Sequence, residues 1–442
     1  MPAGAADVPV AIVGAGACGL TAGLFLRDAG IDCALLERDA LPQGSTALSS
    51  GFVPAAGTRV QREAGVQGDS PARFAADIQA KAKGTAAPHL VAAYTEAIAS
   101  ALDALQERHG LAFELLDGFL YPGHGLRRMH TLRERTGAAL VAALDAAVMR
   151  AGALLLTQAR VSEIWCDNGD RVLGVGYSRP NGAIEHLACR ALLLACNGFG
   201  GNAAMVQELL PEMRRAVFAG HMGNDGSAIA WGRALGAALA DLGGYQGHGS
   251  WAVPQGALIT WALMMEGGIQ VNAHGRRFHD ETAGYSEASV QVLAQPGGIA
   301  WSVFDDRLLV LGRGFPDFVA AEQAGAVRSA SDAGALAALI GCDEDTLAAT
   351  LQGTRLAKPL HAVKVTGALF HTQGGLDIDA RCRVRRTDGT PFPNLLAAGG
   401  AARGVSGNAV WGYHSGNGLL SALAGGAIAA NTLHALITEN AP

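Results

Sequence analysis

The sequence predicts an α/β fold in which a nucleotide-binding domain is interrupted by an inserted α+β cap domain. Three observations support this prediction. A glycine turn joins an apolar strand to a helix near the N-terminus, alanine-rich helical segments and short apolar strands follow up to about residue 244, and glycine-rich β character returns near residue 360. The stretch between carries tryptophans and an Asp- and Ala-rich helical part. We therefore expect a nucleotide-binding domain at 1–244 and 359–442, with a cap domain at 245–358.

The first unit of the chain is a dinucleotide-binding fingerprint. In "VPVAIVGAGACGLTAGLFLRDAGIDCALLERD" an apolar strand runs into Gly14, Gly16 and Gly19, a helix follows, and Glu37 ends the second strand. In this pattern the first glycine allows a tight turn, the second lets a pyrophosphate approach the backbone, and the third lets the helix pack on the strand. The helix N-terminus then faces the phosphates, and Glu37 accepts hydrogen bonds from ribose hydroxyls.

The rest of the nucleotide-binding domain is expected from similar patterns. Residues from about 70 to 150 are alanine-rich and helical, and short strands are expected in "LLLTQARVSEIWC", "RVLGVGYS" and "CRALLLACNGFGGN". Further β segments are "HTQGGLDID" and "NLLAAGGAARG". An insertion within one domain explains why this β character returns so late.

Charge and cysteine content exclude several classes of function. The chain has 442 residues and a formal net charge of -6, with both signs scattered, so no basic stripe favours a nucleic-acid partner. Its seven cysteines form no CxxC pair. This predicts free thiols in a reducing compartment, argues against an iron–sulfur cluster of the usual spacing, and leaves no metal centre expected.

The N-terminus and the last apolar run predict a protein of the cytoplasm. Residues 1–10 lack the charged and apolar regions of a signal peptide. The run from Gly418 to Ile437 is long enough to consider as a membrane span, but Gly425, Gly426 and His434 interrupt it. A buried helix and no membrane span are therefore predicted.

Seven blocks in the chain resemble a known flavoprotein family in content and order. They are "VGAGACGLTAGL", "STALSSGFVPAAGT", "LLACNGFGGN", "GNDGSAIAWGRALGA", "GGIQVNAHGRRFHDE", "HTQGGLDID" and "LLAAGGAARG". Together they resemble the flavoproteins that include the soluble fumarate reductases, the succinate dehydrogenase flavoprotein subunit and the 3-ketosteroid dehydrogenases. The resemblance implies a Rossmann-like FAD-binding domain of the glutathione-reductase type, and a cap that closes over the flavin ring.

The resemblance also implies which residues contact FAD. The positions are Gly14, Gly16, Ala17, Cys18, Gly19, Glu37, Arg38, Ser45, Thr46, Ser49, Ser50, Gly51, Val161, Asn197, Gly198, Asn224, Asp225, Gly399, Gly400, Gly418 and Leu419. Membrane-bound relatives attach FAD through a histidine beside the serine-threonine block, where this chain has Gly44-Ser45-Thr46, so non-covalent FAD is expected. A glutamate usual in the family is replaced by Gly400, so one ribityl contact is in question.

Two further departures concern the substrate. Fumarate reductases carry an arginine after the "GRRFHDE" block and another in the C-terminal glycine segment, where this chain has Tyr285 and Val410-Trp411 at about those positions. Dicarboxylates bind best to bidentate arginines, so both replacements argue against fumarate. The segment "GYHSG" resembles instead the Tyr-x-Ser segment of the ketosteroid dehydrogenases that act at the Δ4 bond, with Tyr413 and Ser415 at the matching positions.

The resemblance therefore implies dehydrogenation, or the reverse reduction, of a carbon–carbon bond next to a carbonyl. Tyr413, Ser415, Tyr285 and His371 are the catalytic candidates, with their separate roles left open. The expected substrate is a small apolar carbonyl compound, with a cyclic ketone such as a 3-ketosteroid favoured, and the electron acceptor or donor is unknown. One alternative is a fumarate-reductase-like reductase that binds an unsaturated acid through His371 and Arg403. Another is a non-catalytic FAD-binding protein.

For several residues a purely structural role is expected or remains open beside a functional one. His371 matches a substrate-contacting histidine of the family's HTxGG block, and a structural histidine is equally expected. His414 should point away from its two neighbours in an extended segment. Arg276 and Arg277 are expected to form a structural ion pair with Glu281. A further set, with pocket lining and core packing both open, is Trp251, Trp261, Met264 and Met265.

Overall fold

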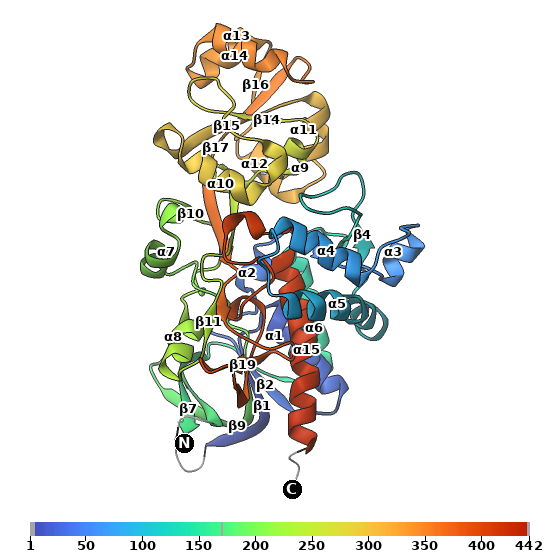
Figure 1. Cartoon of the computed structure of the whole chain (residues 1–442), viewed down its shortest axis with the longest axis vertical. Coiled ribbons are helices and arrows are strands. Elements are labelled where there is room, and N and C mark those ends of the chain that lie inside the picture. Colours follow the sequence, from blue (N-terminus) through green and yellow to red (C-terminus); the bar gives the residue numbers. More distant parts are fainter. Residues whose placement is uncertain (1–4, 169–170, 440–442) are drawn as a thin grey trace.

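The computed structural model describes residues 5–168 and 171–439, which form two bodies joined end to end (Figure 1). One body contains β1, β2, β9 and α15, and we call it the nucleotide domain. The other contains β14 to β17 and α9 to α14, and we call it the cap. The predicted α/β class with an inserted cap is confirmed.

An 8-stranded sheet forms the centre of the nucleotide domain. Its parallel part has the order β20-β9-β1-β2-β6, and β19 extends it antiparallel beside β20. β7 and β8 form an antiparallel extension on the first half of β9. The strands are β1 (Ala6–Val13), β2 (Cys33–Leu36), β6 (Leu154–Leu156), β7 (Arg160–Asp167), β8 (Arg171–Ser178), β9 (Ile184–Leu194), β19 (Arg383–Arg385) and β20 (Pro391–Ala397).

The central strands are apolar and buried because helices cover them. The helices of this domain are α1 (Ala17–Asp28), α2 (Gly44–Ala47), α3 (Arg59–Glu63), α4 (Pro71–Lys81), α5 (Pro88–His109), α6 (Gly137–Arg150), α7 (Ala203–Leu209), α8 (Ser227–Ala234) and α15 (Asn417–Glu439). Residues 10–13 of β1 and all of β2 are buried, which accounts for their unbroken hydrophobic runs.

The last helix, α15, is the buried helix that the sequence predicts. Among the described helices, it alone is long and apolar enough to cross a membrane by length and composition, and 72% of its most apolar window is buried inside the protein. It packs along α1, where a side chain at Gly426 would come within 2.6 Å of the Cys18 carbonyl oxygen. The glycine that interrupts the apolar run thus allows the close contact of the two helices.

A 7-stranded sheet forms the cap, in the order β13-β12-β17-β15-β14, with β10 and β16 also paired to β17. Its strands are β10 (Val217–Phe218), β12 (Tyr245–Ala252), β13 (Ala257–Leu258), β14 (Ile269–Val271), β15 (Ile299–Asp305), β16 (Arg328–Ala330) and β17 (Leu360–Thr372). Its helices are α9 (Ala262–Met265), α10 (Tyr285–Leu293), α11 (Asp306–Gly312), α12 (Pro316–Gln323), α13 (Ala333–Ile340) and α14 (Glu344–Gln352).

The strand pairing moves one predicted domain boundary. Apart from the short β10, the cap sheet begins with β12 at residue 245, where the composition changes. It also includes β17, which the boundary at 358–359 assigned to the nucleotide domain. β17 pairs with β15 and β12 along almost its whole length, so the chain leaves the cap sheet only after Thr372. The buried composition of β17 resembles that of the nucleotide domain because both are sheet cores.

Two small sheets lie outside the two large ones. β3 (Val53–Pro54), β4 (Glu114–Leu115) and β5 (Met129–Thr131) form a 3-stranded sheet, and β11 (Leu239–Ala240) pairs with β18 (Gly375–Leu376). An apolar cluster at the junction contains Phe52 and Met129 from the nucleotide domain beside Trp261 and Tyr285 from the cap. Tyr413 belongs to the same cluster, so the catalytic candidates lie where the two bodies meet.

Candidate functional site

A single cavity runs from the β1–α1 turn to the underside of the cap. It encloses about 260 Å³, against about 10 Å³ for the next cavity found among the described residues. Its lining includes Gly14 and Glu37 at one end, and Tyr413, Tyr285 and Trp261 at the other. One cavity therefore joins the predicted dinucleotide site to the predicted catalytic residues. Residues of the cap cover the second end, while movement of the cap stays a prediction.

The dinucleotide end has the backbone that the glycine fingerprint predicts. Gly14 has a φ of +103°, and a side chain there would lie 2.6 Å from the Ala195 carbonyl oxygen. Gly19 lies in the first turn of α1, where an added Cβ would lie 1.9 Å from the Gly14 carbonyl oxygen. Gly16, Ala17 and Cys18 line the cavity at the N-terminus of α1, which suits a pyrophosphate.

Glu37 is buried at the end of β2 and holds the turn in place. Its carboxylate accepts hydrogen bonds from the amides of Ala15 at 2.9 Å and Asp39 at 3.0 Å. Burial raises the pKa of this carboxyl, while these two amides act in the opposite direction. A carboxylate has lone pairs beyond these two bonds, so it can still accept from ribose hydroxyls. Arg38 and Arg160 lie beside it, and both pair with Asp225.

The serine-threonine block forms the adjoining wall. The Thr46 hydroxyl accepts a hydrogen bond from the Ala17 amide at 3.1 Å, which connects α2 to the start of α1. The Asn224 side chain donates to the Ser45 hydroxyl at 2.8 Å. Gly51 has a φ of +70° and its Cβ position is blocked by the Thr136 carbonyl oxygen. The block thus forms one wall of the cavity, and it contains no histidine to which FAD could be attached.

Most predicted FAD contacts line this cavity, and two do not. The lining contains Gly14, Gly16, Ala17, Cys18, Glu37, Arg38, Ser45, Thr46, Ser49, Ser50, Gly51, Val161, Asn197, Asn224, Asp225, Gly399, Gly400, Gly418 and Leu419. Gly19 and Gly198 lie outside it. A side chain at Gly198 would lie 2.0 Å from the Thr372 hydroxyl, so this glycine allows close packing against β17 rather than a ligand contact. Gly19 acts in the same way in the first turn of α1.

The structure explains why a glycine stands at position 400 in this chain. A Cβ at this position would lie 2.0 Å from Oδ1 of Asn197, whose side chain fills the space. Asn197 adopts a φ of +67° and its Oδ1 accepts a hydrogen bond from the Gly198 amide at 2.9 Å. The side-chain amide of Asn197 therefore occupies the space into which a larger residue at position 400 would project. This amide is the polar group that a bound cofactor would meet there. The glycine turn at the start of α1 and the wall formed by the serine-threonine block leave room for a dinucleotide, so the residues present fit FAD.

The cap end brings together the four catalytic candidates. Tyr285 is the first residue of α10, and Tyr413 and Ser415 lie in the turn before α15. The two tyrosine rings are 6.0 Å apart, centroid to centroid, and His371 lies 5.6 Å from Tyr413. All four side chains line the cavity. The structure thus gathers residues from the cap, from β17 and from the C-terminal turn.

Both tyrosines are buried and protonated at neutral pH. Burial raises the pKa of Tyr285 well above its usual value, and a hydrogen bond from Ser415 lowers it only in part. Burial also raises the pKa of Tyr413, against the amides of Gly418 and Gly416 and a hydrogen bond with Tyr285. The hydroxyl groups of Tyr285 and Tyr413 thus lie near Ser415, whose own hydroxyl donates to the Pro122 carbonyl oxygen at 3.3 Å.

Two histidines reach the cavity from neighbouring strands. His371 on β17 is the Cα partner of Gln246 on β12, and alternation along β12 puts Gln246 and His248 on one face. Burial lowers the pKa of His371 to about 4 and that of His248 to about 3. Nδ1 of His248 accepts a hydrogen bond from the Ser250 amide at 3.1 Å. The neutral ring therefore carries its proton on Nε2 and can donate it to a ligand.

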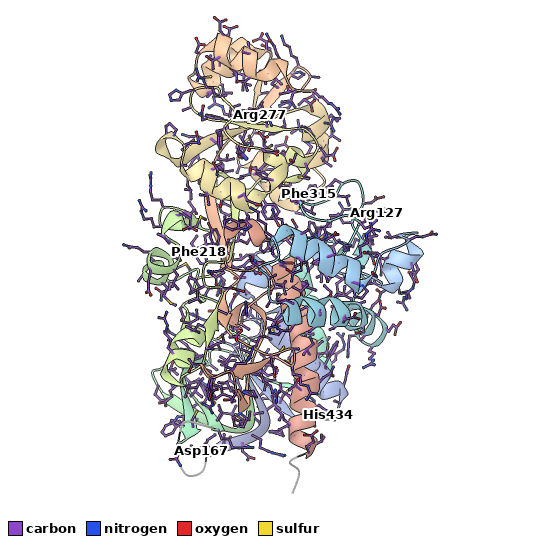
Figure 2. All side chains as sticks on the ribbon, in the orientation of Figure 1. Arg127, Asp167, Phe218, Arg277, Phe315 and His434 are labelled. Carbon is purple, nitrogen blue, oxygen red and sulfur yellow. The ribbon has the colours of Figure 1, made fainter. Side chains whose placement is uncertain are left out.

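Aromatic side chains form the remaining walls under the cap. Trp261, Phe52, Phe315 and Phe370 line the cavity, and Figure 2 shows Phe315 at the base of the cap, beside the junction. Three residues of the set left open, Trp251, Met264 and Met265, lie outside the lining. Of the four, Trp261 alone is a wall residue.

Three other predictions can be compared with the structure. Arg403, named in the alternative as a ligand for a carboxylate, lies outside the cavity lining, and its guanidinium pairs with Asp241 at 2.7 Å and Asp377 at 3.3 Å. Arg277 pairs with Glu281 within the cap, away from the junction, as expected (Figure 2). His414 is buried outside the cavity lining, with its ring 3.9 Å from that of His124, so it points away from the site as predicted.

Sequence reasoning missed several wall residues. They are Gln246, His248, Thr260, Tyr121, Gln373 and Asp317. A signal existed for the first two, because in "YQGHGSW" a period of two places both polar side chains on one face of a glycine-flanked strand. For the others there is no local signal, since their positions depend on how the cap meets the nucleotide domain.

Curated proteins similar to this chain include reductases and a dehydrogenase. The chain is 28% identical over 421 residues to an NADH:fumarate oxidoreductase of Klebsiella pneumoniae, covering 90% of this chain and 45% of that protein. It is 26% identical to a probable fumarate reductase of Shewanella frigidimarina, covering 90% and 70%. It is also 25% identical to a 4-oxocyclohexanecarboxylate 2-dehydrogenase of Sinomonas cyclohexanicum, covering 89% and 87%. The chain thus spans less than half of the Klebsiella protein.

Solved structures share the fold. An open flavocytochrome c3 fumarate reductase superposes with a TM-score of 0.83 at 23% identity, covering 98% of this chain and 79% of the other. A 3-ketosteroid-Δ4-(5α)-dehydrogenase from Rhodococcus jostii superposes with a TM-score of 0.77 at 23% identity, covering 97% of both chains. A model of the FAD binding domain family matches residues 9–419. The chain therefore belongs to the FAD binding domain family.

Proposed function

We propose that the protein uses non-covalently bound FAD to dehydrogenate, or in reverse to reduce, a carbon–carbon bond next to the carbonyl of an apolar compound such as a cyclic ketone. The observation that carries this proposal is the composition of the cavity under the cap. Among the described residues, arginine occurs in the cavity lining only at Arg38 and Arg160, beside Glu37, and lysine does not occur in it. The substrate end is lined by hydroxyl, imidazole and aromatic groups.

These groups suit the chemistry of a ketone. Bound FAD supplies the two-electron acceptor or donor for the β-carbon. Removal of the α-proton moves negative charge onto the ketone oxygen, and preorganised donors aimed at that oxygen stabilise it. Tyr413, Tyr285 and Ser415 offer neighbouring hydroxyls, and His248 offers an Nε2 proton. Because the donors are neutral, they stabilise a developing enolate without binding a carboxylate tightly.

The proton-transfer group is one of the same residues. The rings of Tyr285 and Tyr413 lie 6.0 Å apart and both hydroxyls keep their protons at neutral pH, so in the direction of reduction either hydroxyl can donate a proton to the α-carbon of the substrate. His371 has a pKa of about 4 and is therefore a weak base at neutral pH. We therefore assign proton transfer to the tyrosine–serine group and carbonyl binding to the remaining donors.

A second candidate is the reduction of an unsaturated carboxylic acid. The fumarate reductase names of the Klebsiella and Shewanella relatives favour it, and among the sequence relatives they favour it over the ketone. The Sinomonas relative, named for a cyclic keto acid, supports a carbonyl. In this chain an acid would meet only neutral donors, because Arg403 is engaged with Asp241 and Asp377. The structure of the site thus favours the ketone.

A flavin titration separates these candidates. Oxidised FAD-loaded protein is mixed without oxygen with saturated cyclic ketones, and loss of the flavin absorbance band is followed. Chemically reduced protein is then mixed with cyclic enones, with fumarate and with acrylate, and recovery of the band is followed. The proposal requires a faster response to the ketone or enone. A faster response to the acids supports the second candidate, and no response to any compound supports a non-catalytic flavoprotein.

A further inference from the structure

The cap places one carboxylate in the cavity wall, that of Asp317. It is the second residue of α12 and lies at the junction, where the Ser50 hydroxyl of the nucleotide domain donates to Oδ2 at 3.4 Å. Among the described residues Ser50 is its only hydrogen-bond partner, and no cation pairs with it. Burial raises the pKa of this carboxyl. A partly desolvated, unpaired carboxylate gains from any hydrogen-bond donor that a ligand brings.

The surroundings of Asp317 are aromatic and hydroxylic. The Phe52 ring lies 6.0 Å from Tyr121 and 6.5 Å from Phe315, and all three rings line the cavity. Thr260 hydrogen-bonds to Tyr121, and the Asp317 charge acts on the same hydroxyl. This end therefore combines apolar walls with one anionic acceptor.

We propose that this end of the cavity selects a substrate that carries a hydrogen-bond donor, a hydroxyl or an ammonium group, and disfavours a carboxylate at the same position. The proposal rests on the function proposed above and names the substrate class more closely. A donor on the substrate replaces the hydration that Asp317 loses on burial, whereas a carboxylate would face a like charge. Aromatic walls beside an anion also suit an ammonium group.

A simpler explanation is that α12 needs an acidic residue in its first turn. Acidic residues are favourable there because of the helix dipole. Asp345 holds the same second position in α14, where it is exposed to solvent. Asp345→Asn thus removes the same helix-terminal charge without touching the cavity, and it is the matched control for Asp317→Asn.

The test measures ligand preference in the FAD-loaded protein. Four cyclohex-2-enones are used that carry a methyl, hydroxymethyl, aminomethyl or carboxylate group at carbon 4, and binding is followed by the change in the flavin spectrum. We expect the parent to bind the hydroxymethyl or aminomethyl compound about ten-fold or more tightly than the methyl compound, as for a hydrogen bond to a charged group. The carboxylate should bind most weakly.

The variants then locate the cause. In Asp317→Asn the dissociation constants of the methyl compound and of the hydroxymethyl or aminomethyl compound should become nearly equal. This variant should also bind the carboxylate compound more tightly than the parent does. Asp345→Asn should keep the parent's ratios of dissociation constants. The aminomethyl-to-hydroxymethyl ratio shows which donor is preferred. Equal binding of the methyl and donor compounds by the parent overturns the proposal without any variant, and so do unchanged ratios in Asp317→Asn. A parent that binds no enone and responds only to acids refutes the proposed function itself.

Discussion

The hydroxyl of Tyr413 carries the first test of the site. Tyr413→Phe keeps the ring that packs against Tyr285 and His371 and removes only the hydroxyl. We expect kcat on the preferred ketone or enone to fall about a hundred-fold or more, the range for one oxyanion donor or proton-transfer group. FAD content and melting temperature should stay at the parent's values. Steady-state kinetics and thermal melts measure both.

The control for this change is Tyr177→Phe. Tyr177 lies on β8 and packs against Arg179, outside the cavity lining. Its replacement should leave turnover intact. Parent-like turnover by Tyr413→Phe would show a packing role for this tyrosine, and the ketone assignment would lose its main support.

At the scale of elements, the contact between β1 and α1 decides whether the cofactor is held. An added Cβ at Gly19 meets the Gly14 carbonyl oxygen at 1.9 Å, so Gly19→Ala must push the helix away from the turn. We expect FAD affinity to drop about ten-fold or more, consistent with the cost of overpacking a backbone contact. Flavin per protein chain after gel filtration, with titration of added FAD, measures this loss.

The same helix supplies the comparison. A Cβ at Gly23 meets only the side chain of Leu35, with Cδ1 nearest at 2.9 Å, and this side chain can shift. Gly23→Ala should therefore retain its flavin. Equal FAD retention by the two variants would mean that the start of α1 is not held by this contact.

At the scale of the whole molecule, the first expectation is that FAD leaves when the fold is lost. The serine-threonine block carries Gly44, Ser45 and Thr46 and no histidine for attachment. Acid precipitation should therefore release yellow FAD into the supernatant, identified by its mass and by chromatography. Flavin that stays with the pellet would reveal a covalent link, and FMN in the supernatant would refute the dinucleotide assignment.

The second whole-molecule expectation is a loss of stability in acid. Burial holds the pKa values of His124, His130 and His371 at about 4 and that of His248 at about 3, below the ordinary 6.5. The unfolded chain binds protons at these sites below about pH 6.5, whereas the folded chain does so only near pH 4 or lower. Stability should therefore fall as the pH drops from about 6.5 to 4.

Thermal melts of the FAD-loaded protein between pH 7.5 and pH 4.5 measure this loss. His124→Gln removes one buried site and should make the pH dependence shallower. His434→Gln changes an exposed histidine on α15 and should leave the dependence unchanged (Figure 2). A melting temperature that does not change over this range would contradict the assignment of neutral buried histidines.

The sequence by itself determined the fold class, the dinucleotide turn with Gly14, Gly16 and Glu37, and the position of α15. Glycine spacing and hydrophobic periodicity are enough to predict these features, because both patterns can be read within each segment. The Tyr413 turn was predicted only through a family resemblance.

Only the tertiary structure decided how the substrate end is built. Gln246, His248 and Asp317 come from β12 and α12, distant in sequence from Tyr413, and they meet it because the cap lies over the nucleotide domain. The same packing placed β17 in the cap sheet, moved Gly198 out of the cavity lining and engaged Arg403 with two aspartates. No local sequence pattern predicts these contacts, because each joins segments whose own sequences are compatible with the cap and with the nucleotide domain.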